Sequence, residues 1–142
     1  MNRSRIQTAI LNVVAIIVGI IILFIANTLI TFAFGIILSF PIIAALLSWP
    51  STPTLYALTA SNIASVYLGG MACYKICSPT KGGFLPGMLG YGLICFALFV
   101  LSAYGIFMQY GFCDAVICHI FGAILSAAMI SGAKSEECRL DL

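Results

Sequence analysis

Residues 6–74 read IQTAILNVVAIIVGIIILFIANTLITFAFGIILSFPIIAALLSWPSTPTLYALTASNIASVYLGGMACY, and this stretch contains no Asp, Glu, Lys or Arg. About 20 consecutive apolar residues cross the hydrocarbon core of a bilayer as an α-helix. The helix is favoured there because lipid offers no partner to a free N–H or C=O, and a helix pairs both internally. The stretch therefore predicts an integral membrane protein with several helical spans.

The composition of the whole chain agrees with this prediction. Of its 142 residues 63% are hydrophobic and 7% are charged, and the mean hydropathy is +1.19. Soluble domains carry roughly 25% charged residues. We expect one all-α transmembrane bundle over residues 1–142, and the net charge of +2 gives no indication of a nucleic-acid partner.

The basic residues predict the orientation. They form three clusters, which are Arg3 with Arg5, Lys75 with Lys81, and Lys134 with Arg139. Basic residues in short loops concentrate on the cytoplasmic side, so an even number of crossings should separate each cluster from the next. Four spans in the cell membrane, with both termini cytoplasmic, satisfy this condition.

Four stretches are expected to form these spans: Ala9–Thr31, Leu55–Tyr74, Phe84–Met108 and Ala115–Ala133. A fifth hydrophobic segment, Phe34–Leu47, contains Pro41, which removes a backbone donor and kinks a helix. We expect this segment to be a broken or re-entrant element that does not cross. The alternative is five spans, with a turn at Asn27 and Thr28 that divides the first stretch into two helices.

Three connections are predicted from Pro, Gly and polar residues. The segment Trp49–Pro53 should face outside, because Trp favours the headgroup region, and Ser78–Gly83 should face the cytoplasm. Gln109–Phe112 should form a short outer turn in which Gly111 is free to adopt a positive φ.

Small residues recur at helical spacing in two spans. The first set is Ala57, Ser61, Ser65, Gly69 and Cys73, and the second is Ala123, Ala127 and Ser131. In lipid such faces let helix backbones approach closely. The hydrophobic effect does not favour helix association there, so dispersion contacts between the helices take its place. These faces predict either packing within one chain or a homo-oligomer interface. Interhelical hydrogen bonds of Asn12 and Asn27 would add about 0.6 to 2 kcal/mol each.

Two segments carry a family resemblance: Ser65-Val-Tyr-Leu-Gly69-Gly70-Met-Ala72 and Lys81-Gly82-Gly83-Phe-Leu-Pro-Gly87-Met-Leu-Gly90. Over about residues 55–133 the chain resembles a family of small four-helix membrane proteins of Gram-positive bacteria that has no established activity. The long uncharged N-terminal region departs from the family pattern. The resemblance implies a topology and no chemistry.

The six cysteines lie at positions 73, 77, 95, 113, 118 and 138. Neither Cys73-x-x-x-Cys77 nor Cys113-x-x-x-x-Cys118 is a C-x-x-C motif, and no pair of such motifs exists to build a zinc site. Free Cys also serves as a small apolar residue in a core. We expect structural cysteines and no bound metal or cofactor, with a Cys113–Cys118 disulfide or redox pair as the alternative.

Asp114 and His119 are the ionisable residues at or within a span. An ionisable side chain in a membrane is costly unless it is paired, and it often marks an ion or proton path. Asp114, however, stands at a helix start, where a carboxylate favourably meets the N-terminal amides. The pair is therefore interpreted either as capping and packing residues or as part of an ion or proton path.

The sequence contains no catalytic triad, paired carboxylates, P-loop or dinucleotide motif, so we do not expect an enzyme. The favoured function is helix–helix association in the membrane, as a homo-oligomer or as an accessory subunit of other membrane proteins. The first alternative is a small oligomeric channel or transporter, which requires a polar cavity lined by Asp114, His119 or an Asn. The second alternative is a membrane thiol-redox protein, which requires two sulfurs within bonding distance.

Overall fold

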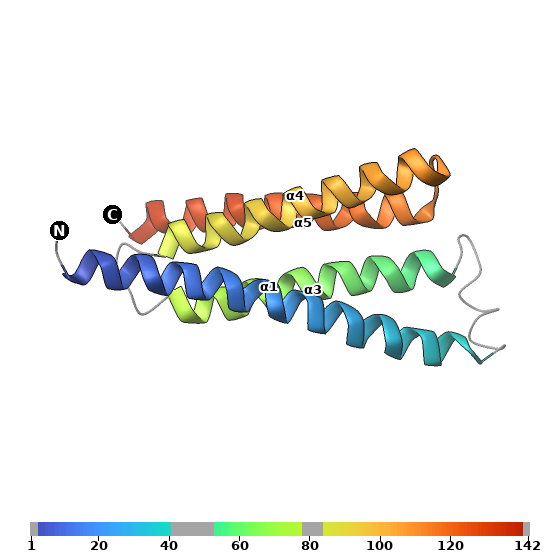
Figure 1. Cartoon of the computed structure of the whole chain (residues 1–142), viewed down its shortest axis with the longest axis horizontal. Coiled ribbons are helices and arrows are strands. Elements are labelled where there is room, and N and C mark those ends of the chain that lie inside the picture. Colours follow the sequence, from blue (N-terminus) through green and yellow to red (C-terminus); the bar gives the residue numbers. More distant parts are fainter. Residues whose placement is uncertain (1–2, 41–52, 78–83, 141–142) are drawn as a thin grey trace.

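The computed structural model describes residues 3–40, 53–77 and 84–140, which form four α-helices and no strands. The helices are α1 (Arg3–Leu38), α3 (Pro53–Cys77), α4 (Phe84–Tyr110) and α5 (Asp114–Leu140). They run alternately up and down, so that the start of α1 and the end of α5 lie at the same end of the molecule (Figure 1). The prediction of an all-α bundle is confirmed.

Three of the described helices are long and apolar enough to cross a membrane. These stretches are Arg5–Ile37, Pro86–Tyr110 and Asp114–Gly132. The described part of the chain therefore has the character of a multi-pass membrane protein. Helix α3 is 25 residues long but is not among the three, because Thr, Ser and Asn residues lower its hydropathy.

Helix α1 differs from the expected span Ala9–Thr31. It is continuous over 36 residues, about 54 Å at the usual rise of an α-helix. It passes through Asn27 and Thr28 without a turn, and the hydroxyl of Thr28 donates to the carbonyl of Phe24 within the helix (2.9 Å). The five-span alternative with a turn at these residues is therefore wrong.

The first part of the expected re-entrant segment Phe34–Leu47 is also corrected. Residues 34–38 continue α1, because nothing in their sequence interrupts the helical hydrogen bonds before Ser39. Pro41 and the rest of that segment lie outside the described residues, as do Trp49–Thr52 and Ser78–Gly83.

The turn between α4 and α5 confirms the positive φ expected at Gly111, although Gln109 and Tyr110 of the expected turn still belong to α4. Gly111 has φ of +74°, and its amide donates to the carbonyl of Phe107 (2.8 Å), which closes the end of α4. The carbonyl of Cys113 then accepts from the amides of Val116 (3.0 Å) and Ile117 (3.3 Å) and starts α5.

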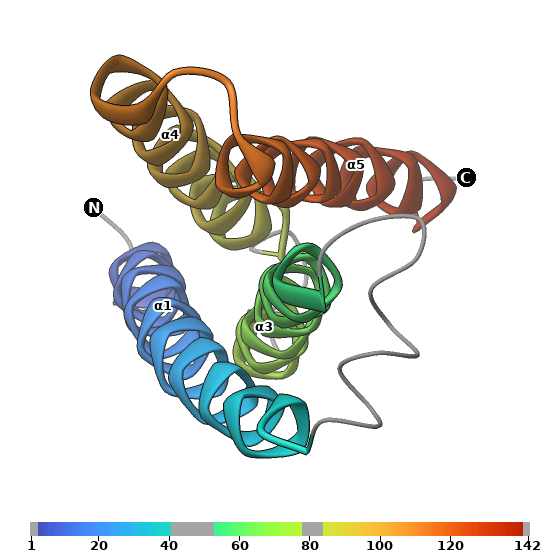
Figure 2. The same ribbon diagram turned by 90° about the vertical axis from the view of Figure 1, so that its right-hand side faces the viewer.

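Helix α3 is the central helix of the bundle. It packs against α1, α4 and α5 (Figure 2). Helix α4 also contacts α1 and α5. The closest pairs are α1 with α3 and α4 with α5, and the two pairs diverge toward the end that carries the α4–α5 turn (Figure 1).

The burial of α3 side chains is inverted relative to a soluble protein. Ser61 and Ser65 are fully buried, whereas Tyr67 and Leu68 are 56% and 44% exposed. The polar face of the helix meets its neighbours and the apolar face points outward. This is the arrangement expected of a helix whose surroundings are lipid.

Helices α1, α3 and α4 meet closely at a point that we call the glycine crossing, formed by Gly19, Gly69 and Tyr91. A Cβ on Gly69 would collide with the Tyr91 hydroxyl and lie 2.5 Å from the carbonyl oxygen of Gly19. The Tyr91 hydroxyl donates to the carbonyl of Val66 (2.9 Å), and its ring is fully buried. Only a residue without a side chain fits at position 69.

Candidate functional site

A network of polar side chains joins α1 to α3 beyond the glycine crossing, where the helix pairs begin to diverge. The side-chain amide of Asn27 donates to Oδ1 of Asn62 (2.9 Å) and lies 3.4 Å from the hydroxyl of Ser65. The hydroxyl of Ser61 is 2.8 Å from that of Thr31 and donates to the carbonyl of Asn27 (3.0 Å). Polar side chains from two helices thus satisfy one another inside an apolar bundle.

Helix α5 joins the same network through Cys118. Nδ2 of Asn62 donates to the carbonyl of Cys118 (3.2 Å), and the Thr59 hydroxyl donates to the Cys118 thiol (3.3 Å). Asn62 is only 5% exposed. One buried side chain therefore fixes the position of three helices.

Beside this network lies a cavity of about 170 Å³ to which all four described helices contribute. We call it the four-helix cavity. Its lining residues are Leu23, Phe24, Asn27, Asn62, Leu98, Phe99, Ser102 and His119. It is open at one side, where Phe24 and Leu98 are 56% and 37% exposed.

The tautomer of His119 follows from a hydrogen bond within α5. Nδ1 of His119 lies 2.7 Å from the carbonyl oxygen of Ala115. A carbonyl oxygen can only accept, so Nδ1 carries the proton and Nε2 of the neutral ring keeps a free lone pair. The ring packs against Phe99 with a centroid separation of 6.0 Å.

Three polar atoms around the four-helix cavity have no hydrogen-bond partner within the described chain: Oδ1 of Asn27, Oγ of Ser102 and Nε2 of His119. A polar atom in an apolar environment costs free energy until it finds a partner. The cavity can therefore accept hydrogen bonds from a bound group.

Asp114 and His119, the predicted ion or proton pair, occupy different places. His119 lines the cavity, whereas Asp114 is the first residue of α5 and does not line it. Asn27, Asn62 and Ser102 were not predicted as site residues. An Asn within an apolar span was the available signal, because an amide in lipid requires a partner.

The predicted packing residues divide into buried and exposed groups. Ser61, Ser65, Gly69 and Cys73 on α3 and Ala123 on α5 are buried. The side chain of Ala57 lies outside the described part. Ala127 and Ser131 are exposed, which corrects their expected packing within the chain: α5 is buried along Gly122 and Ser126 instead. One residue along a helix rotates the face by about 100°.

None of the five described cysteines forms a disulfide, so Cys113 and Cys118 do not form the alternative disulfide. The thiols of Cys73, Cys77 and Cys95 are fully buried around the glycine crossing. No group of three His, Cys, Asp or Glu residues in the described ranges is arranged to hold a metal ion.

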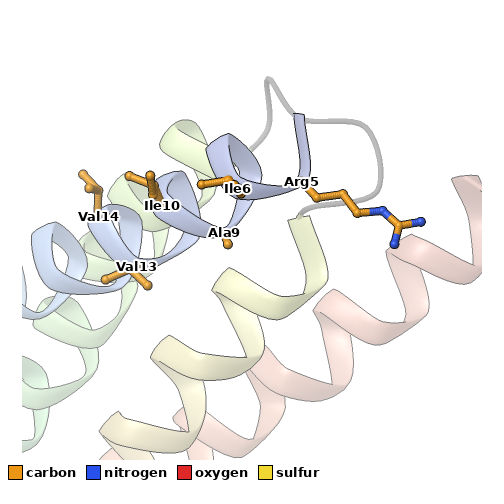
Figure 3. A pocket seen from close by; sticks show the side chains of 6 residues that line it. All are labelled: Arg5, Ile6, Ala9, Ile10, Val13 and Val14. Atoms are coloured by element: carbon orange, nitrogen blue, oxygen red, sulfur yellow. The ribbon is translucent and has the colours of Figure 1, made fainter. Parts of the chain in front are cut away.

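A larger hollow, about 590 Å³, lies along the start of α1. It is lined by Arg5, Ile6, Ala9, Ile10, Val13 and Val14. Figure 3 shows the Arg5 side chain extending away from the apolar ones. Because the described residues of its lining all belong to one helix and only one of them is polar, the described part of this hollow shows no converging polar groups of the kind that define a solute site. The four-helix cavity is the better candidate despite its smaller volume.

Comparison with protein-family models, with curated proteins and with solved structures finds no match for this chain. The resemblance to small four-helix membrane proteins of Gram-positive bacteria stays a prediction.

Proposed function

We propose that the bundle lies in the cell membrane, that α3 is its fourth span, and that both termini face the cytoplasm. The 25 residues of α3 extend about 37 Å, which exceeds the hydrocarbon thickness of about 30 Å. Within its middle turns, Ser61, Asn62 and Ser65 are buried against neighbours, whereas Ile63, Leu68 and Met71 are exposed, and this arrangement lowers the cost of insertion once the bundle forms.

Impermeant thiol labelling of intact cells tests this orientation. On a background without cysteine, Lys81→Cys should stay unlabelled from outside, and Gln109→Cys should react. The Gln109→Cys variant also controls for insertion and reagent access. Labelling of Lys81→Cys from outside would contradict the four-span arrangement.

We propose that the protein is a small channel or transporter that binds a polar solute in the four-helix cavity. The observation that carries this proposal is the convergence of Asn27, Asn62, Ser102 and His119 from four helices on one cavity. Polar groups inside an apolar bundle are expensive and commonly mark a substrate path. Four helices enclose no wide pore, so an oligomer would complete the path.

Flux into proteoliposomes tests this function. Acetamide, methylammonium and acetate represent neutral, cationic and anionic small solutes. Asn27→Leu should strongly reduce the protein-dependent flux of the transported solute, because it removes a polar group from the cavity wall. Thr28→Val is the matched control, since Thr28 bonds only to its own helix and does not line the cavity. Flux equal to that of protein-free vesicles for every solute would refute the proposal.

The second candidate function is helix–helix association, as a homo-oligomer or as an accessory subunit. The exposed small residues Ala127 and Ser131 favour it, because a small face in lipid allows close approach of a partner helix. Oxidative cross-linking of Ala127→Cys in native membranes should give dimers. The control is Ala97→Cys, an exposed alanine on α4. Equal cross-linking of the two variants would exclude this face.

A further inference from the structure

The hydrogen bonds around the four-helix cavity determine which amide atoms remain free. The carbonyl of Cys118 can only accept, so the Asn62 atom that faces it must be Nδ2. Oδ1 of Asn62 then faces Asn27, and the Asn27 atom that meets it must be the donor Nδ2. One backbone carbonyl therefore fixes both amide orientations and leaves Oδ1 of Asn27 free.

The same reasoning applies to His119. Its Nδ1–H is used by the carbonyl of Ala115, which leaves Nε2 as an acceptor. Nδ2 of Asn27 donates to Asn62 and lies 3.4 Å from the hydroxyl of Ser65, whereas one of the two N–H groups of Asn62 donates to the carbonyl of Cys118. The free groups of Asn27 and His119 are therefore acceptors, and Ser102 can act as either partner.

The described residues that line the cavity include no Asp, Glu, Lys or Arg. A cation bound there would lack a counter-charge, and an anion would meet the lone pairs of Asn27 and neutral His119. The rest of the wall, Leu23, Phe24, Leu98 and Phe99, is apolar. The volume of about 170 Å³ admits only a small molecule.

We infer that the four-helix cavity binds a small uncharged solute through an N–H or O–H donor, which Oδ1 of Asn27 and Nε2 of His119 accept. The apolar remainder of the solute lies against the Leu and Phe walls. The solute class is that of a primary amide, a urea or a short alcohol. This inference rests on the proposed function and adds the chemistry of the solute.

The single histidine of the chain provides a direct probe. Protein labelled with ¹⁵N-histidine and placed in lipid nanodiscs gives signals from one imidazole. Without solute, the spectrum of the neutral ring should show a protonated Nδ1 and an unprotonated Nε2. An Nε2–H tautomer would overturn the inference.

Titration with acetamide should shift the Nε2 signal in a saturable way. N,N-dimethylacetamide keeps the carbonyl but has no donor, so it should give no such shift. Asn27→Leu should weaken acetamide binding about tenfold, the effect of losing one hydrogen bond of about 1.4 kcal/mol. Thr28→Val should bind acetamide like the unaltered protein.

The outcomes separate the two claims. Equal shifts with both amides, or a saturable response to acetate or methylammonium without one to acetamide, would overturn the inferred solute class and leave the transport proposal standing. No response to any of these probes, together with no flux of any of them, would refute the transport proposal itself.

Discussion

The two halves of the bundle on either side of Ser65 are built from similar residues and packed differently. In the tight half, Gly19, Gly69 and Tyr91 meet without space for one methyl group. In the open half, Asn27, Asn62 and His119 border a cavity of about 170 Å³. The helix pairs α1–α3 and α4–α5 lie close in the first and diverge in the second (Figure 1).

The contrast shows that the residues of the opposing helices determine whether the buried face of α3 forms a packed contact or a hydrogen-bonded network. Ser61, Ser65, Gly69 and Cys73 form one buried stripe. Where the stripe meets glycine and a tyrosine ring, it closes into a dry contact. Where it meets Asn27, it becomes a hydrogen-bonded network with unpaired acceptors beside it.

The tight half has one polar exception. Asn12 is 8% exposed, and its Oδ1 has no hydrogen-bond partner within the described residues. Among the described residues Oδ1 of Asn12 therefore accepts no interhelical hydrogen bond, whereas Asn27 forms the one expected of it. A lone buried acceptor costs about 1–3 kcal/mol, and the tight packing around it must offset that cost.

The largest effect is expected at the glycine crossing. Gly69→Leu should cost several kcal/mol, since each inserted set of methylenes in a packed core costs about 1–3 kcal/mol and here backbone atoms must also move apart. The free energy of unfolding in mixed detergent micelles measures this. Gly35→Ala is the control, because a Cβ at Gly35 would contact nothing within 4 Å. Equal stability of Gly69→Leu and the unaltered protein would show that the tight half is not packed as described.

A smaller effect is expected in the open half. Asn62→Ala removes the hydrogen bonds to Asn27 and Cys118 and should cost about 1–2 kcal/mol, the upper range for polar contacts between membrane helices. A double-mutant cycle with Asn27→Ala isolates the coupling between the two amides. Thr28→Val should leave the unfolding free energy unchanged. A coupling of zero would mean that the open half is held by something other than this pair.

Much of the fold could be predicted from the distribution of charge and of glycine and proline. Helices α3, α4 and α5 were expected at Leu55–Tyr74, Phe84–Met108 and Ala115–Ala133. Helices α3 and α5 extend the expected span at both ends, and α4 starts as expected at Phe84 but continues to Tyr110. The ends were underestimated because helices continue past the hydrocarbon into the interface, where hydropathy gives no signal. The end of α1 was placed too early for another reason, because the apolar residues 34–38 were assigned with Pro41 to a separate segment.

The site could not be predicted because it depends on the register between helices. Spacing along one helix shows which residues share a face, but not which residue of another helix stands opposite. Asn27 and Asn62 are 35 positions apart, and His119 lies on a third helix. The error at Ala127 and Ser131 has the same origin. Helix α5 has two faces of small residues one position apart, and both are equally plausible from sequence. The contacts with α4 determine which of them is buried.

The smallest effect is expected at Asp114, which stands at the open end of the bundle but outside the cavity lining. Its carboxylate lies in the first turn of α5, where a negative charge gains about 0.3–1 kcal/mol from the helix dipole. Asp114→Asn keeps the polar side chain and loses only this charge, so the unfolding free energy should fall by no more than about 1 kcal/mol. Solute flux should be unchanged, in contrast to Asn27→Leu. If folded and inserted Asp114→Asn protein lost its flux, the functional path would have to include the start of α5, and the division between cavity and helix cap would be wrong.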